Sequence, residues 1–102
     1  MESIVGKLQK VGLTEYEAKV YLSLLSDHLN SASKLSEKSG VPRTKIYSVL
    51  ESLEGKGWIR IYSGVPPLFK AIDPHAIFEK IKKDYDDFLE SIQTIFDVST
   101  ME

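Results

Sequence analysis

Residues 31–53 have the sequence SASKLSEKSGVPRTKIYSVLESL, which predicts two helices joined by a tight turn. Ser31 or Ser33 can cap the first helix, because a serine hydroxyl accepts a hydrogen bond from a free backbone N–H. Gly40 stands where the helix end needs a residue that tolerates a positive φ. Pro42 suits the first position of the second helix, because its missing N–H would have no intrahelical partner there. This is the pattern of a helix-turn-helix, whose second helix can enter the major groove of DNA.

The second helix, over about residues 42–55, divides into an apolar face and a polar face. The i, i+3, i+4, i+7 spacing of a side that packs into a core is followed by Ile46, Val49, Leu50 and Leu53. The opposite side carries hydroxyl and cationic groups, which can donate to base edges and phosphates. We predict base-edge contacts from Arg43, Thr44, Tyr47 and Ser48. The alternative is an ordinary solvated helix face, where most charges of any helix lie.

Length and composition describe a soluble protein of one domain. The chain has 102 residues, of which 42% are hydrophobic, and no apolar run approaches the roughly 18 residues of a membrane span. Its first residues, MESIVGK, lack the basic start and apolar run of a secretory signal. The absence of cysteine excludes disulfides and thiolate metal sites. We expect a cytoplasmic protein.

Charge is unevenly distributed along the chain, although the net charge is only −2. Residues 34–72 carry seven Lys and Arg against three Asp and Glu, a net of +4, whereas residues 1–33 carry −1 and residues 73–102 carry −5. Salt screens charges over about 8 Å, so acids on a distant element hardly weaken a local basic surface. We expect moderate, strongly salt-dependent DNA affinity. The predicted phosphate contacts are Ser33, Lys34, Lys45, Lys56, Arg60 and Lys70.

Two further helices are predicted before the helix-turn-helix. Residues 2–10 form a short amphipathic helix that ends at Gly12. Thr14 and Glu17 have the spacing of a capping box, which starts a helix that runs to about Asp27. The expected buried stripe of this helix is Ala18, Tyr21, Leu22 and Leu25, widened by Tyr16, Val20 and Leu24.

A β-hairpin is predicted after the helix-turn-helix. Residues 58–63 (WIRIYS) and 68–72 (LFKAI) are rich in β-branched and aromatic residues and predict two strands. Residues 64–67 (GVPP) form the turn, because proline cannot donate to a strand ladder. Residues 29–31 could add one rung to the hairpin. The predicted fold class is therefore mainly α with a small β-hairpin, a winged helix whose hairpin tip can reach the DNA backbone or minor groove.

Three segments of the chain carry a family resemblance: LTEYEAKVY (13–21), SGVPRTKIY (39–47) and LESLEGKGW (50–58). They closely resemble the N-terminal winged-helix domain of the TrmB family, transcriptional regulators found largely in archaea, many of them sugar-responsive. The hairpin resembles the family pattern Gly-x-Pro-x-x-aromatic-x-Ala-x-Asp-Pro through Gly64, Pro66, Phe69, Ala71, Asp73 and Pro74. The resemblance covers residues 7–74 and implies double-stranded DNA as the partner.

The chain departs from the family pattern in two respects. Family hairpins often have Lys or Arg where this chain has Val65, Pro67 and Leu68, so its apolar tip should hold phosphate less well. Larger family members continue into an effector domain that binds sugars, whereas this chain ends at Glu102. We therefore expect a stand-alone DNA-binding regulator, in which sugar sensing is not carried over and any small-molecule effector is unknown.

A long amphipathic helix is predicted after Asp73-Pro74, with Asp as the cap. Apolar residues recur at steps of three and four over residues 75–97, and leaving six of them in water would forgo on the order of 10 kcal/mol. We expect a homodimer interface, parallel or antiparallel, formed by Phe78, Ile81, Tyr85, Phe88, Leu89, Ile92, Ile95 and Phe96. The alternative is a helix folded back on its own domain. In this scheme residues 1–74 form the DNA-binding domain and 98–102 a polar tail.

Patterns of catalytic or metal sites are missing from the sequence. His28 and His75 are the two histidines, lack partners at metal-ligand spacing and are most simply surface residues. The acids of residues 84–90 lack the EF-hand pattern, and neither a glycine-rich phosphate loop nor a nucleophile elbow occurs. We expect no enzyme activity, no cofactor and no metal.

Taken together, these patterns predict a sequence-specific, double-stranded-DNA-binding transcriptional regulator. Two alternatives stay open. The chain could be a winged-helix protein–protein interaction module, which its net acidity and apolar hairpin tip favour. It could also be the N-terminal part of a larger ligand-sensing regulator.

Overall fold

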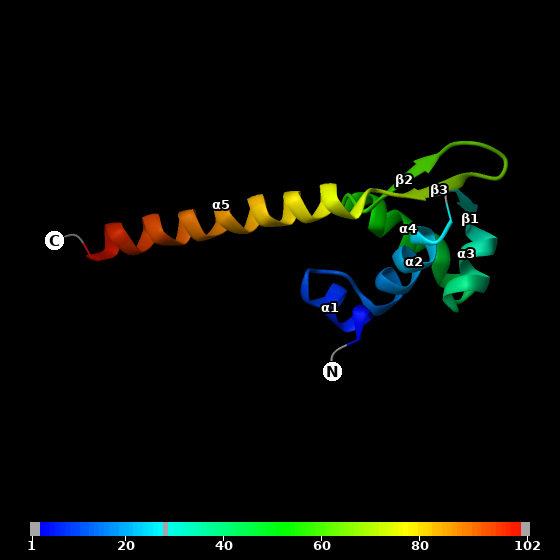
Figure 1. The fold of residues 1–102 in the computed structure, drawn as a ribbon, viewed down its shortest axis with the longest axis horizontal. Coiled ribbons are helices and arrows are strands. Elements are labelled where there is room, and N and C mark those ends of the chain that lie inside the picture. Colours follow the sequence, from blue (N-terminus) through cyan, green and yellow to red (C-terminus); the bar gives the residue numbers. More distant parts are fainter. Residues whose placement is uncertain (1–2, 28, 101–102) are drawn as a thin grey trace. The chain divides into compact units, whose positions relative to one another are not determined.

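The structure, a computed structural model, describes residues 3–27 and 29–100, so His28 and the end of the predicted tail lie outside the described residues. The elements occur in the order α1 (Ile4–Lys10), α2 (Glu15–Leu25), β1 (Asn30–Ser31), α3 (Ala32–Ser39), α4 (Arg43–Gly55), β2 (Ile59–Tyr62), β3 (Leu68–Ala71) and α5 (Pro74–Thr100) (Figure 1). Contacts divide the chain into two units, Met1–Ile72 and Asp73–Glu102, and each is described by itself.

The helix-turn-helix is formed by α3 and α4. Ser31 caps α3 by accepting a hydrogen bond from the Lys34 N–H at 3.3 Å. Gly40 ends α3 with a φ of 76°, as its place in the sequence predicts. Pro42 differs from the prediction by one position: its ψ of 146° is extended, so it caps α4 and the helix begins at Arg43.

The core of the first unit is formed where α2 packs against α3, α4 and the sheet. All four residues of the predicted apolar stripe of α4 are buried. The predicted stripe of α2 is only partly right, because Leu25 is exposed and Leu22 is half-buried, whereas Glu17 is 2% exposed. The buried apolar residues of this unit are Leu13, Ala18, Val20, Tyr21, Leu24, Ala32, Leu35, Val41, Ile46, Val49, Leu50, Leu53, Trp58, Ile59 and Phe69.

An aromatic pair joins α2 to the segment that leads into the sheet. The Tyr21 and Trp58 rings meet edge to face, with centroids 5.1 Å apart and an interplanar angle of 88°. The Tyr21 hydroxyl donates to the Ile72 carbonyl oxygen at 2.9 Å, so the polar end of this buried ring is satisfied. The hydrogen bond connects residues 51 positions apart in the sequence.

The sheet has three antiparallel strands in the order β1-β3-β2. β2 and β3 form the predicted hairpin, in which Arg60 faces Lys70 and Ile61 faces Phe69. β1 adds the predicted rung on the other side of β3, where Ser31 pairs with Leu68. Alternation along the strands puts Phe69 in the core and Arg60 and Lys70 on the exposed face. A helix-turn-helix followed by such a hairpin is the winged-helix fold.

The second unit is dominated by α5. Asp73 caps its start, since the His75 N–H donates to Asp73 Oδ1 at 3.1 Å. The helix continues to Thr100, three residues beyond the predicted end at residue 97, because no glycine or proline after Pro74 interrupts it. In the single chain Ile81 and Ile92 are half-buried, and the exposed large apolar residues of the helix include Phe78, Tyr85, Phe88, Leu89, Ile95 and Phe96. No described helix is long and apolar enough to cross a membrane.

Candidate nucleic-acid interface

The four predicted base-edge residues lie on the first two turns of α4, and all four are exposed. They are exposed because the opposite side of the same turns carries Ile46 and Val49 into the core. Tyr47 is 58% exposed, so its ring can contact a partner that approaches this side of α4. The Ser48 hydroxyl donates to the Lys45 carbonyl oxygen at 2.9 Å, so it offers an outside partner only its acceptor lone pairs.

The start of α3 lies beside the start of α4. Arg43 Nη2 donates to Ser33 Oγ at 2.6 Å, across the turn of the helix-turn-helix. A hollow of about 200 Å³ is lined by these two residues together with Ile46 and Tyr47. Ser33, a predicted phosphate contact, and Arg43, a predicted base-edge contact, are therefore hydrogen-bonded to each other and line the same hollow. Lys34, the next residue of α3, is exposed beside Ser33.

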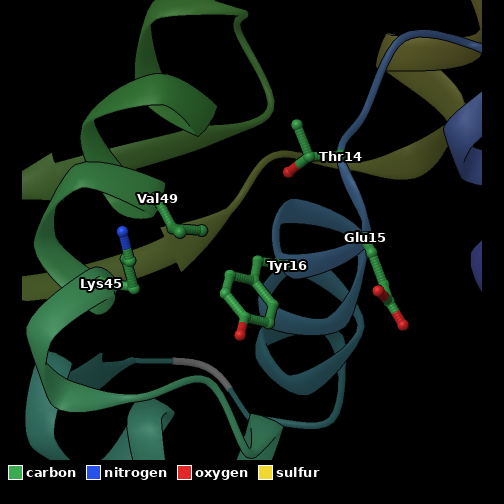
Figure 2. Close-up of a pocket in the computed structure, with 5 residues that line it drawn as sticks. All are labelled: Thr14, Glu15, Tyr16, Lys45 and Val49. Carbon is green, nitrogen blue, oxygen red and sulfur yellow. The ribbon is translucent and has the colours of Figure 1, made fainter.

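A second hollow, of about 350 Å³, lies between the start of α2 and the flank of α4. Figure 2 shows the Tyr16 ring on α2 facing Lys45 and Val49 on α4, with Thr14 and Glu15 at the α2 end. Lys45 thus lines the flank of α4 next to α2, rather than the hollow beside Ser33. Its position differs from that of Arg43 because the two residues are two positions apart on the helix, which is more than half a turn.

Two cations of the hairpin form a directly facing pair. Arg60 on β2 and Lys70 on β3 are cross-strand partners, and both are exposed. Cβ atoms of facing residues are about 4.5–5.5 Å apart, and like charges at that separation destabilise the hairpin. An anion above the sheet would reduce this repulsion. The hairpin tip itself is apolar, with Val65 fully exposed.

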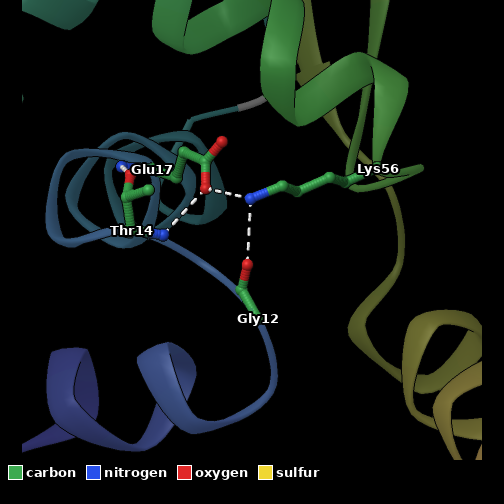
Figure 3. A network of polar contacts seen from close by, with 4 residues as sticks. All are labelled: Gly12, Thr14, Glu17 and Lys56. Atoms are coloured by element: carbon green, nitrogen blue, oxygen red, sulfur yellow. Dashed lines mark hydrogen bonds and ion pairs between the residues drawn. The ribbon is translucent and has the colours of Figure 1, made fainter.

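Lys56 differs from the other predicted phosphate contacts. Its Nζ donates to Glu17 Oε1 at 2.6 Å and to the Gly12 carbonyl oxygen at 2.9 Å (Figure 3). Thr14 completes the network, because its N–H donates to Glu17 Oε1 at 2.8 Å and its hydroxyl accepts from the Glu17 N–H at 3.1 Å. Glu17 is therefore both half of the predicted capping box, which is confirmed, and half of an ion pair. This geometry gives Lys56 a structural role.

The surroundings of Glu17 hold its carboxylate in the charged form. Burial by itself raises the pKa of Glu17. Hydrogen bonds from Lys56, Ser52 and the Thr14 N–H, together with the positive charge of Lys56, outweigh burial and leave the pKa below its usual value. Glu17 therefore stays ionised when the protein is folded at neutral pH.

Among the described residues, the cations of α3, α4 and the hairpin differ in whether they pair with a carboxylate. Lys19, Lys38, Lys56, Lys80 and Lys83 each pair with an acidic side chain. Within residues 3–27 and 29–100, no ion pair is formed by Lys34, Arg43, Lys45, Arg60 or Lys70. These five cations are therefore not neutralised by acidic side chains of the described chain. The same part of the chain holds no group of three or more His, Cys, Asp or Glu that could bind a metal ion.

Two contacts of this region have no clear signal in the sequence. The Ser33–Arg43 bond joins residues ten positions apart, and the Glu17–Lys56 pair joins residues 39 apart. Both depend on how the helices pack. The sequence indicates only that Ser33 and Arg43 lie within two residues of the caps Ser31 and Pro42, at the starts of successive helices.

The family model described as "Sugar-specific transcriptional regulator TrmB" matches residues 8–75 of the chain, which include the whole winged helix. The chain belongs to the TrmB family. Among TrmB relatives it is similar to the "HTH-type sugar sensing transcriptional regulator TrmBL1" of Pyrococcus furiosus, with 41% identity over 95 residues. That match covers 93% of this chain but 28% of TrmBL1. The chain therefore spans less than a third of this relative.

Two solved structures are similar in fold to this chain. The structure of TrmBL2, described as an archaeal chromatin protein with a novel mode of DNA binding, aligns with a TM-score of 0.85 and 27% identity. The alignment covers 94% of this TrmB chain and 38% of that one. A possible transcriptional regulator from Methanosarcina mazei aligns with a TM-score of 0.78 over 93% of this chain and 90% of its own. Its identity is 15%, so it supports the winged-helix fold alone.

Proposed function

We propose that this chain is a sequence-specific, double-stranded-DNA-binding transcriptional regulator. The first turns of α4 enter the major groove, where Arg43, Thr44 and Tyr47 contact base edges. Ser48 contributes as an acceptor. Phosphates on either side are held by Lys34, Lys45, Arg60 and Lys70, while the apolar hairpin tip adds little to phosphate binding.

The observation that carries the proposal is the set of unpaired cations around an exposed helix start. Lys34, Arg43, Lys45, Arg60 and Lys70 come from four separate elements, yet none is neutralised by an acid of the described chain. A protein-docking surface has no need for unneutralised, mutually repelling cations such as Arg60 and Lys70. A phosphate backbone does, because each phosphate contact releases a condensed counterion and so favours binding.

The chain acts as a homodimer through α5, whose apolar residues are exposed in the single chain. A two-fold dimer presents two copies of α4, so the matching DNA site is a pseudo-palindrome. Its half-sites lie one or more helical turns apart, at about 10 base pairs per turn.

DNA binding is tested by selecting bound sequences from a random duplex pool and then titrating the selected duplex at several salt concentrations. We expect enrichment of a pseudo-palindrome. Four phosphate contacts predict a slope of log K against log salt of about −4 per protomer. Lys34→Ala should weaken all duplexes alike and reduce this slope by about 1.

The control is Lys83→Ala, because Lys83 lies on α5 and pairs with Asp87. This variant should leave both the affinity and the slope unchanged. An affinity for random and selected duplexes that is weak and nearly independent of salt would contradict DNA binding. It would favour the interaction-module alternative.

A further inference from the structure

Among the four predicted base contacts, Arg43 has the longest side chain and therefore the most rotamers when nothing holds it. An arginine side chain loses much rotamer entropy when its position is restricted. Holding it in place before DNA arrives lowers the cost of ordering it in the complex. Tyr47 lies one turn further along α4 and lines the same hollow, so it limits the space on one side of Arg43.

Ser33 is placed to hold Arg43 on the other side. Its hydroxyl oxygen accepts from Arg43 Nη2 at 2.6 Å, and it belongs to α3, whose next turn is anchored in the core by Leu35. The bond uses one of the five guanidinium N–H donors, so enough donors remain for a bidentate contact with a guanine edge. Ser33 therefore contacts one donor of the Arg43 guanidinium and leaves the other donors available.

We propose that Ser33 is a positioning residue that acts through Arg43, rather than a phosphate contact in its own right. Ser33 sets the direction of the guanidinium across the turn and thereby contributes to sequence discrimination. This inference rests on the proposed DNA-binding function. It differs from the sequence-based prediction that Ser33 holds a phosphate, and the tests below decide between the two roles.

The first test needs no DNA. The chain has two arginines, Arg43 and Arg60, so a ¹⁵N spectrum of arginine Nε resonances contains one signal from the site and one internal control. We expect Arg43 Nε to have a higher order parameter than Arg60 Nε in the free protein. Ser33→Ala should lower the Arg43 value to that of Arg60 and leave Arg60 unchanged, whereas Ser33→Thr should retain it. Equal order parameters in the unmodified protein would overturn the proposal, whatever the protein binds.

The second test uses the selected duplex and its single-base variants. Arg43→Ala should abolish discrimination at one base pair in each half-site. Ser33→Ala should reduce discrimination at that same base pair by about 3- to 10-fold, leave other positions and the salt slope unchanged, and have no effect in the Arg43→Ala background. Ser33→Thr should restore discrimination, because it retains the hydroxyl.

Two variants serve as references. Ser26→Ala removes an exposed serine at the end of α2, outside the interface, and should change nothing. Lys34→Ala should weaken all duplexes uniformly. If Ser33→Ala instead behaves like Lys34→Ala, or still lowers affinity when Arg43 is absent, Ser33 is a phosphate contact and the proposal fails while DNA binding stands. Failure to bind any duplex would contradict the proposed function, and the NMR comparison would still decide the role of Ser33.

Discussion

Among single residues, Glu17 is a charged side chain that is 2% exposed in the first unit. Its carboxylate is almost fully buried, and Lys56, 38% exposed at its side chain, supplies the compensating charge. The pair also ties the end of α4 to the start of α2 and, through the Gly12 carbonyl oxygen, to the loop after α1. A buried carboxylate that loses such a partner becomes strongly unfavourable.

Glu17 should make folding sensitive to acid. Because its pKa is lowered in the folded state, its contribution to stability is fully present above the ordinary carboxyl value of about 4.5. The contribution is lost as the pH falls through the lower folded-state value. We expect Glu17→Gln to reduce the free energy of unfolding by about 1–3 kcal/mol at pH 7 and by much less at pH 3. Urea unfolding of both proteins at the two pH values measures the difference.

Glu15→Gln is the matched control, since Glu15 is exposed and makes only an i,i+4 pair with Lys19. It should change stability by a few tenths of a kcal/mol at either pH. A loss in Glu17→Gln that is the same at pH 3 and pH 7 would show that the ionised carboxylate contributes nothing.

At the scale of elements, the turn between α3 and α4 depends on the backbone of Gly40. Its φ of 76° is unfavourable for residues with a Cβ, although an added Cβ would meet no atom within 4 Å. We expect Gly40→Ala to destabilise the protein by about 1–2 kcal/mol through the backbone alone. Gly55, at the end of α4, has equally open surroundings and no positive φ.

Gly55→Ala therefore serves as the control. It should stabilise the protein by about 0.4–1 kcal/mol, the opposite of the effect expected for Gly40→Ala. Thermal unfolding of the two variants measures both effects: the melting temperature should fall for Gly40→Ala and rise for Gly55→Ala. Small and equal changes in the stability of both variants would mean that the turn at Gly40 relaxes around the added methyl group.

Local signals account for most of the elements that the sequence predicts correctly. The Thr14–Glu17 capping box, the glycine at the end of α3 and the apolar stripe of α4 each involve residues within one or two helical turns. The buried side of α2 was predicted less well. A helix surrounded by α1, α3, α4 and β3 buries more than one face, so periodicity alone does not select the residues.

The candidate site shows the same limit. The sequence predicted the exposed residues of α4, since an exposed face is the complement of an apolar stripe. It did not predict that Lys56 is paired or that Ser33 meets Arg43, because both contacts join separate helices. Which side chains of two separate helices meet depends on how the helices pack, and local sequence patterns do not predict that packing.

At the scale of the whole molecule, the exposed apolar residues of α5 bear on assembly. The proposed dimer requires α5 to bury its apolar stripe against a second copy. We expect sedimentation to show a dimer at tens of micromolar. The double variant Phe88→Asp/Ile92→Asp should be monomeric, because two buried charges per helix would face each other.

The control introduces the same charges on another side of the same helix, as Gln93→Asp/Thr94→Asp. This variant should remain dimeric and should bind the selected duplex like the unmodified protein. A monomer in the unmodified protein would contradict the dimer proposal and leave the DNA-binding face unaffected.

The strand order of the sheet bears on how the protein behaves at high concentration. With β3 in the centre, the edges are β1, which has two residues, and β2, which has four and carries Arg60. Edge strands offer unpaired N–H and C=O groups that a neighbouring chain can join, and shortness and charge both discourage it. The sheet that carries Arg60 and Lys70 therefore has edges to which strands of other molecules add poorly. We expect this to limit fibrous aggregation at high protein concentration.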